Sequence, residues 1–259
     1  MTTGPTITTE DYLAHVRAAV AHLAHAVEQG PLDARVAACP DWNVRELAAH
    51  VGFVHRWAEA AARTAERPDL HDAGPPDDAD GRALAAWLRH GAHRLVATLR
   101  TIDAGAPTWH PFPVPRVVAV WPRRQAHETA IHAWDAEQAV GLTPATINWL
   151  IAADGVAEYF ELVVPRLVDR EAVALPTASL VVRSTDTGHA WRIVAEDTDV
   201  IVTAIGRDVV DGDGDGEATL AGPAAAILGR LWDRPIDDEA VVVSGDRTVA
   251  DAWLALPGM

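Results

Sequence analysis

The spacing of apolar residues changes near residue 172 of this 259-residue chain, and this change constrains the fold more than any single motif. Before it, apolar residues recur with the period of an amphipathic helix in five segments. These segments are residues 8–29, 41–64, 82–102, 121–140 and 143–168. After it come short runs of β-branched residues between turn residues, which predict antiparallel strands. These runs are residues 178–184, 190–196, 199–206 and 216–222.

The two patterns call for different layers, so we expect an α+β fold with two domains. Residues 1–170 are predicted to form a helical bundle and residues 171–259 a small α+β domain. Short helices are expected in the second domain at 223–234 and 248–256. The acidic repeat at 211–217 lacks the glutamate that closes a calcium loop, so we expect a turn there.

Composition excludes several classes of function. No apolar stretch approaches the roughly 20 residues of a membrane-spanning helix, and residues 1–16 lack the order of a signal peptide. We therefore expect a cytoplasmic protein without a membrane partner. The net charge of −16 argues against nucleic acid, which needs a clustered positive surface. All 21 basic residues are arginine, a bias that suggests a GC-rich genome such as that of an actinobacterium.

The single cysteine, Cys39, cannot form an intramolecular disulfide. It precedes the second helix, whose start is marked by a capping box of Asn43 and Glu46. A helix dipole could activate such a thiol. We favour the simpler interpretation, a small half-buried residue in the turn that enters the helix.

The fourth helical segment contains "RRQAHETAIHAWDAEQAVG", residues 123–141, which is close to the zinc-protease pattern H-E-x-x-H. His127 and His132 are five residues apart and point about 140° away from each other on a helix, so they cannot share a metal. Glu128 and His132 are four apart and share a face, which extends to Arg124 and Asp135. This stripe predicts Glu128 and His132 as metal ligands, with Asp135 and Arg124 as the partners that orient them.

A catalytic metal site needs a third protein ligand, and His50 is the best candidate among the twelve histidines. It lies in the middle of the apolar stripe of the second helix, whereas His55 is expected to point outward. Two alternatives remain open at this point: a core histidine satisfied by a hydrogen bond, and a surface Glu–His pair without a metal. The remaining histidines are interpreted as surface or incidental residues. They are His15, His22, His25, His71, His90, His93, His110 and His189.

The segments "CPDWNVRELAAHVGFVHRWA" (39–58) and 123–141 closely resemble the two diagnostic stretches of the mycothiol-dependent maleylpyruvate isomerase family. This family belongs to the DinB-like, thiol-dependent S-transferase superfamily. The resemblance implies an up-down DinB-like bundle followed by a sterol-carrier-like α+β domain, and a divalent metal, usually zinc, on His50, Glu128 and His132. It also implies an active-site arginine in the second domain, best matched by Arg234, with Arg230 a weaker match.

The function implied by the resemblance is thiol chemistry. Mycothiol would act as cosubstrate and add to an electrophilic small molecule, as in an isomerase or an S-transferase. In this mechanism Asp135 orients His132, Arg124 balances the carboxylates, and Arg234 holds an anionic group. A metal-dependent hydrolase and a non-catalytic small-molecule-binding protein are the alternatives. The electrophile, and whether the protein is a monomer or a homodimer, are left open.

Overall fold

The computed structural model describes residues 5–70, 73–171, 173–205 and 217–256. Their contacts divide the chain into two compact units. One unit comprises Ile7–His110 and Pro115–Thr146, and the other contains Pro111–Val114 and the chain from Ile147 onward. The expected turn at 211–217 lies almost wholly outside the described residues.

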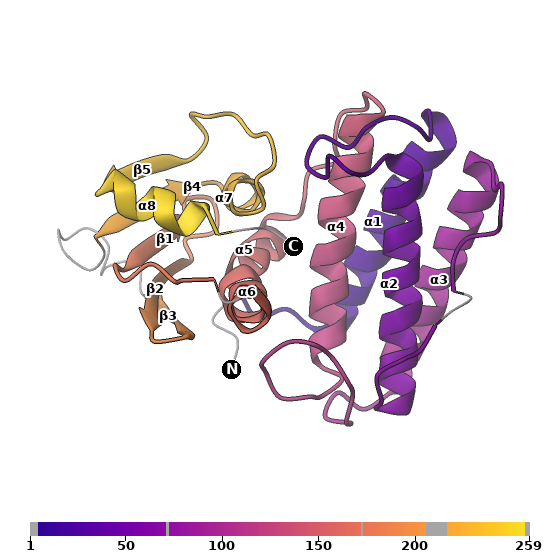
Figure 1. Ribbon diagram of the computed structural model, residues 1–259, viewed down its shortest axis with the longest axis horizontal. Helices are drawn as coiled ribbons and strands as arrows, with labels where there is room; N and C mark the ends of the chain where they lie inside the picture. Colours follow the sequence, from indigo (N-terminus) through magenta and orange to yellow (C-terminus); the bar gives the residue numbers. More distant parts are fainter. Residues whose placement is uncertain (1–4, 71–72, 172, 206–216, 257–259) are drawn as a thin grey trace. The chain divides into compact units, whose positions relative to one another are not determined.

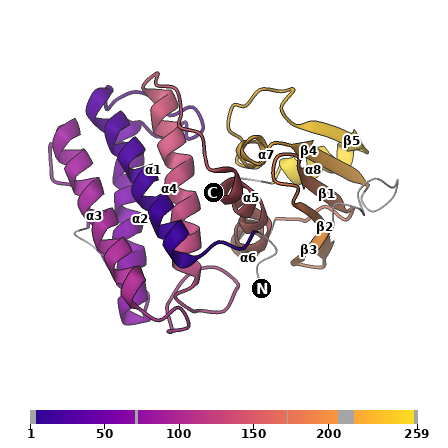
Figure 2. The same ribbon diagram turned by 180° about the vertical axis from the view of Figure 1, so that it is seen from behind.

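The first unit is a four-helix bundle (Figures 1 and 2). Its helices are α1 (Thr9–Gln29), α2 (Val44–Thr64), α3 (Gly81–Thr101) and α4 (Val120–Ala139). Helices α1 and α2 each pack against both α3 and α4, so α1 and α2 lie on one diagonal of the bundle. The α2–α4 pair and the α1–α3 pair therefore form opposite sides of the bundle.

The helix ends follow from local chemistry that the sequence displays. Asn43 accepts a hydrogen bond from the backbone of Glu46, and the Glu46 side chain accepts one from the backbone of Asn43, which completes the expected capping box of α2. Helix α4 ends before Gly141, whose φ of 76° lies in the left-handed region that glycine adopts without strain. These signals place the ends of the helices that carry the candidate site.

Two histidines differ from expectation because they are buried. His55, expected to point outward, is fully buried in the structure, and its Nε2 lies 2.9 Å from Thr129 Oγ1 on α4. Helix α2 packs against two neighbours, so its buried arc is wider than a single apolar stripe indicates. His110, interpreted as incidental, is also fully buried, with Nε2 3.1 Å from the Pro115 carbonyl oxygen.

The second unit combines helices with one sheet. The expected fifth helix is divided into α5 (Trp149–Glu158), a π-helix η1 (Tyr159–Val163) and α6 (Val164–Glu171). The sequence pattern assigned this segment to the bundle, whereas its contacts group it with the sheet. The boundary at residue 170 stays a prediction about where an independently folding domain ends.

The sheet has five strands in the order β3-β2-β1-β4-β5. They are β1 (Leu180–Ser184), β2 (Ala190–Glu196), β3 (Asp199–Ile205), β4 (Ala218–Gly222) and β5 (Val242–Gly245). Strand β4 pairs with β1 in parallel, which differs from the expected antiparallel strands. Strand β5 is not among the expected strands, because four residues are too few for a pattern of alternating residues. Two helices, α7 (Ala224–Leu231) and α8 (Arg247–Leu254), complete the unit. Among the described residues, none of the helices is both long enough and apolar enough to cross a membrane.

The buried His55 predicts a specific loss of stability in acid. Burial lowers the pKa of His55 to about 4 from an ordinary value of 6.5. The unfolded chain therefore takes up this proton at higher pH than the folded protein. Neutral, buried His55 therefore contributes about 3 kcal/mol to the unfolding free energy. This contribution is complete above about pH 6.5 and is lost as the pH falls toward 4.

We expect His55→Gln to reduce the pH dependence of the unfolding free energy in this window by nearly one proton. Urea unfolding at several pH values between the two pKa values measures this slope. The exposed His25 offers a matched control, His25→Gln, which should leave the slope unchanged. An unchanged slope in His55→Gln would contradict the assignment of a neutral, buried imidazole.

Candidate metal site

Helix α4 presents four polar side chains along one face, at the spacing that the sequence predicted. Arg124, Glu128, His132 and Asp135 follow one another at intervals of four, four and three residues. The Arg124, His132 and Asp135 side chains are no more than 8% exposed, and that of Glu128 is 12% exposed. Buried polar groups need hydrogen-bond partners, and most of the partners of these four side chains are other residues of the same stripe.

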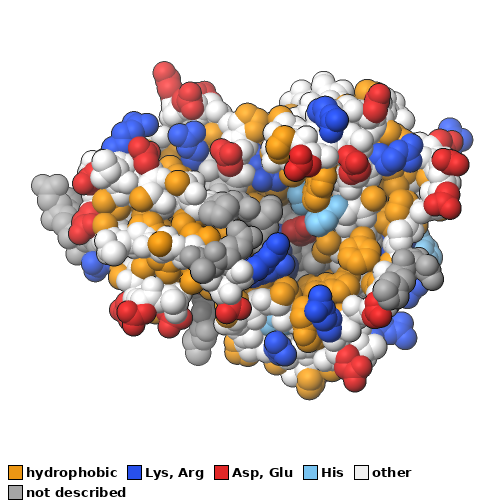
Figure 3. All heavy atoms as spheres, viewed as in Figure 1, with side chains coloured by type: hydrophobic (Ala, Val, Ile, Leu, Met, Phe, Trp, Pro, Cys, Tyr) orange, Lys and Arg blue, Asp and Glu red, His pale blue; other side chains and the backbone are white. Residues whose placement is uncertain are grey.

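His50 of α2 completes the group from across the helix pair. Its Nε2 lies 3.0 Å from Glu128 Oε1, and His132 Nε2 lies 3.3 Å from the same oxygen. One ligand atom from each of His50, Glu128 and His132 lies within 4.8 Å of the other two. The His50 side chain is 33% exposed rather than fully in the core, so the group is open to solvent on its side. Figure 3 shows histidine side chains next to a carboxylate on this face of the bundle.

The electrostatics of the group favour ionised forms. Burial alone would raise the pKa of Glu128, but the Arg124 guanidinium and hydrogen bonds with His132 and His50 hold it well below its usual range. Burial alone would lower the pKa of His132, but the hydrogen bonds and charges of Asp135 and Glu128 raise it to about 9. Without a cation, the protonated imidazole supplies the positive charge that the two carboxylates attract.

Two residues of the stripe fix the orientation of the central pair. His132 Nδ1 lies 3.1 Å from Asp135 Oδ2, so Nδ1–H donates to the carboxylate and Nε2 is directed toward Glu128. Arg124 donates to Glu128 Oε2, which leaves Oε1 facing the two histidines. In metal sites, ligating side chains are commonly oriented in this way, by hydrogen bonds to the atoms that do not face the metal.

The donor set fits a divalent cation. Two imidazole nitrogens and one carboxylate oxygen form a His₂Glu set of the kind that holds catalytic zinc, and three protein ligands leave positions for an exogenous group. The ligand atoms already converge, and both Glu128 and His132 have fixed orientations. His50 is hydrogen-bonded to Glu128, as the alternative of a satisfied histidine requires, and His132 contacts the same carboxylate oxygen, as a metal site requires.

Two residues of the turn before α2, Cys39 and Trp42, lie next to the candidate metal site, and the sequence motifs did not predict this. The Trp42 indole packs on His50 with ring centroids 4.6 Å apart, and its centroid lies 6.0 Å from that of His132. The sulfur of Cys39 lies within 4.8 Å of ligand atoms of both His132 and Asp135. The sequence indicated these contacts only by the position of Cys39 and Trp42 at the start of segment 39–58, which also contains His50.

The two arginines expected from the second domain belong to the second unit. Arg234 follows α7 and is 5% exposed; its guanidinium donates to the Trp232 carbonyl oxygen at 2.7 Å. Arg230 lies on α7 with a half-exposed side chain, 3.7 Å from Asp238. Their roles at the metal site stay predictions.

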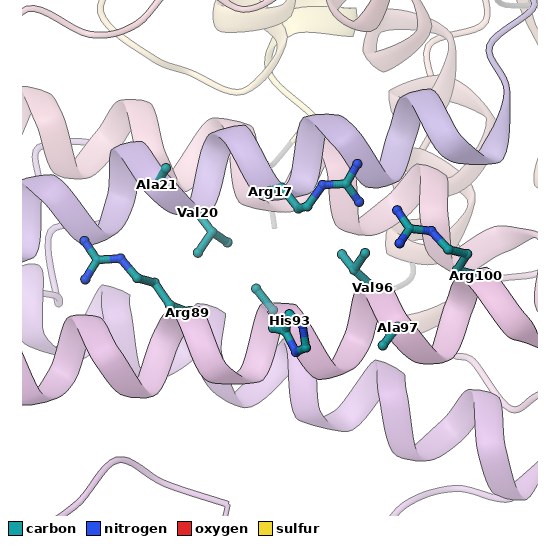
Figure 4. A pocket seen from close by; sticks show the side chains of 9 residues that line it. Arg17, Val20, Ala21, Arg89, His93, Val96, Ala97 and Arg100 are labelled. Carbon is teal, nitrogen blue, oxygen red and sulfur yellow. The ribbon is translucent and has the colours of Figure 1, made fainter.

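A groove on the opposite side of the bundle lacks the converging donor atoms of the His50, Glu128 and His132 group. It has a volume of about 470 Å³ between α1 and α3 and is lined by Val20, Val96 and three arginines (Figure 4). Arg17 and Arg100 pair with Glu10, and Arg89 pairs with Glu28. Its lining contains a single metal-donor side chain, His93.

Comparison with known proteins gives one family and one fold. Residues 13–137 match the family described as the mycothiol maleylpyruvate isomerase N-terminal domain. The crystal structure of the mycothiol-dependent maleylpyruvate isomerase is similar, with a TM-score of 0.59 and 15% identity, over 92% of this chain and 93% of that chain. A histidine-to-alanine mutant of that isomerase gives a TM-score of 0.57 and 14% identity over the same shares. None of the curated proteins matches.

These comparisons confirm the expected α+β class, a helical N-terminal region followed by a small mixed sheet. The matched family segment includes His50, Glu128 and His132 together with Arg124 and Asp135. Residues 13–137 therefore belong to the mycothiol maleylpyruvate isomerase N-terminal domain family, and the similar crystal structures share the fold over 92% of this chain.

Proposed function

We propose that this protein is a cytoplasmic, metal-dependent enzyme that uses mycothiol as a nucleophile toward an electrophilic small molecule. The observation that carries the proposal is the convergence of His50, Glu128 and His132, with their ligand atoms within 4.8 Å of one another. The family match over residues 13–137 supports the thiol, because the matched domain is named for mycothiol and the similar crystal structure is that of a mycothiol-dependent enzyme.

His50, Glu128 and His132 are the residues that would hold the cation, which we propose to be zinc. When bound, such a cation lowers the pKa of a coordinated thiol, so that thiolate is available at neutral pH. The chain itself supplies the orientation: Asp135 keeps the proton of His132 on Nδ1, and Arg124 keeps Glu128 ionised. Trp42 shields one face of His50 from water.

The thiol chemistry balances without a further reactant. The sulfur adds to one carbon of a cis double bond that is conjugated to a carbonyl, and the proton from the thiol is carried by solvent or substrate. Rotation about the resulting single bond followed by elimination of the same thiol gives the trans product, which is the isomerase outcome. Release of the adduct is the S-transferase outcome. Family membership favours the isomerase.

Arg234 is our candidate for holding an anionic group of the thiol or the electrophile, with Arg230 as the alternative. A guanidinium forms paired hydrogen bonds with a carboxylate, and maleylpyruvate-like electrophiles carry carboxylates. Arg234 is the more preorganised of the two, because its guanidinium is buried and already donates to the Trp232 carbonyl oxygen.

The metal assignment predicts that each ligand is required for binding. His50→Ala, Glu128→Gln and His132→Ala should each lower zinc occupancy well below the wild-type stoichiometry, measured by elemental analysis of the purified protein. His25→Ala, which removes an exposed histidine of α1, is the matched control and should keep full occupancy. Full occupancy in both His50→Ala and His132→Ala would refute the site.

Asp135 should act on the metal through His132. We expect Asp135→Asn to lower zinc affinity by about 10- to 100-fold, the usual effect of removing a carboxylate that orients a ligating histidine. Competition with a chromophoric chelator measures the affinity, and circular dichroism checks that the bundle is intact. An affinity equal to that of the wild type would show that Asp135 has only a packing role.

The thiol predicts a second dependence. Turnover of maleylpyruvate by the zinc-loaded protein should fall to background when mycothiol is omitted and should return when it is added. Treatment with a chelator should abolish turnover, and added zinc should restore it. Turnover of an electrophile or an ester without any thiol would indicate a metal-dependent hydrolase instead. Ligand binding without turnover in metal-free His50→Ala would indicate a binding protein.

A further inference from the structure

The single cysteine of the chain lies beside the candidate metal site, in the turn that precedes α2. The turn is held by backbone hydrogen bonds, from Cys39 to the Val36 carbonyl at 3.1 Å and from Trp42 to the Cys39 carbonyl at 2.8 Å. Cys39 is half-buried. Its position is therefore set by the same turn that places Trp42 against His50.

Cys39, His132 and Asp135 form a second group of metal-donor side chains. The Cys39 sulfur, a ring nitrogen of His132 and a carboxylate oxygen of Asp135 all lie within 4.8 Å of one another. His132 is 6% exposed and Asp135 is 4% exposed, so two of the three donors are buried. The group joins the turn before α2 to one turn of α4, and it includes a donor that the first group lacks.

The chemistry of the two groups differs in softness. His50, Glu128 and His132 offer nitrogen and oxygen, whereas Cys39 adds a thiolate, which soft cations prefer. We propose that Cys39, His132 and Asp135 form a second cation position that takes thiophilic metals such as Cd²⁺. When the cation binds, the thiol proton of Cys39 and the proton on the coordinating nitrogen of His132 are both released to solvent.

The two positions should exclude one another because they share His132. The Asp135 carboxylate also orients His132 through the contact of 3.1 Å. A cation that draws on Asp135 and His132 from the Cys39 side withdraws this support from the first group. A thiophilic metal would therefore reduce the affinity of the first position for zinc, which gives the protein a route to inhibition by soft metals.

A cadmium titration of the metal-free, full-length protein tests the proposal without an activity assay. Because Cys39 is the only cysteine, thiolate-to-cadmium charge-transfer absorption reports on this position alone. We expect the absorption to saturate at one equivalent in the wild type. In His50→Ala it should persist, at the same or a lower cadmium concentration, because the competing position is lost.

The contribution of the buried donors is measured in the His50→Ala background, which removes competition. Adding Asp135→Asn should raise the cadmium concentration at half-saturation by roughly 10-fold or more. The matched control is Cys39→Ser combined with Ala252→Cys, which moves the thiol to an exposed helical position in α8. This control should show only the weak affinity of an isolated thiol.

Three results would overturn the second position. Loss of the absorption in His50→Ala, with its fold intact, would make Cys39 a fourth ligand of the first group. An affinity unaffected by Asp135→Asn, or equal to that of the relocated thiol, would make Cys39 an isolated thiol. One cadmium for two chains would indicate a site shared between copies. Each outcome is independent of whether mycothiol is the cosubstrate.

Discussion

The candidate site depends on Glu128, a carboxylate that is shared between two imidazoles and a guanidinium. Oε1 lies 3.0 Å from His50 and 3.3 Å from His132, while Oε2 accepts a hydrogen bond from Arg124. Removing one partner of a buried ion pair typically costs about 3–5 kcal/mol, because the remaining charge is left uncompensated. Glu128 is therefore a structural link between α2 and α4 as well as a candidate ligand, so Glu128→Gln is expected to lower both stability and zinc occupancy.

The bundle makes this arrangement possible because α4 lies against two neighbours. It packs on both α1 and α2, so polar residues on more than one face need partners. One turn of α2 beyond His50, the Nε2 atom of His55 is hydrogen-bonded to Oγ1 of Thr129. Oε1 of Glu137 lies 3.0 Å from Nδ1 of His22 on α1. These contacts fix the rotation of α4 about its axis. The rotation in turn decides which face carries Glu128 and His132 toward His50.

The candidate site was largely predictable because its residues lie at helical intervals. The stripe from Arg124 to Asp135 follows from the geometry of one helix, and the place of His50 in the apolar stripe of α2 made it the candidate third ligand. Burial of His55 was not predictable in the same way, because it depends on how many neighbours α2 has. The contacts of Cys39 and Trp42 depend on a turn whose backbone path leaves no periodic signal.

The fold was predictable by class but not in its connections. The change of period at residue 172 indicates helices followed by strands, and both are present. The grouping of residues 147–171 with the sheet depends on tertiary contacts, because the apolar pattern of a helix does not reveal which surface it covers. The parallel pairing of β1 with β4 likewise depends on the route of the chain between them, which strand composition does not encode.

The donor group of His50, Glu128 and His132 contains nitrogen and oxygen only, which agrees with the external thiol that we propose. A group that already contained a thiolate would donate more charge to the cation and leave it less able to stabilise a second one. Cys39 lies near enough to His132 and Asp135 to belong to another group, yet His50, Glu128 and His132 converge without it. The hydrogen bond from His132 to Asp135 turns the shared imidazole toward Glu128, so that the nitrogen and oxygen donors are the ones already assembled. If both proposals hold, Asp135 would favour one group over the other, because its carboxylate orients His132 in the first and would be a ligand in the second.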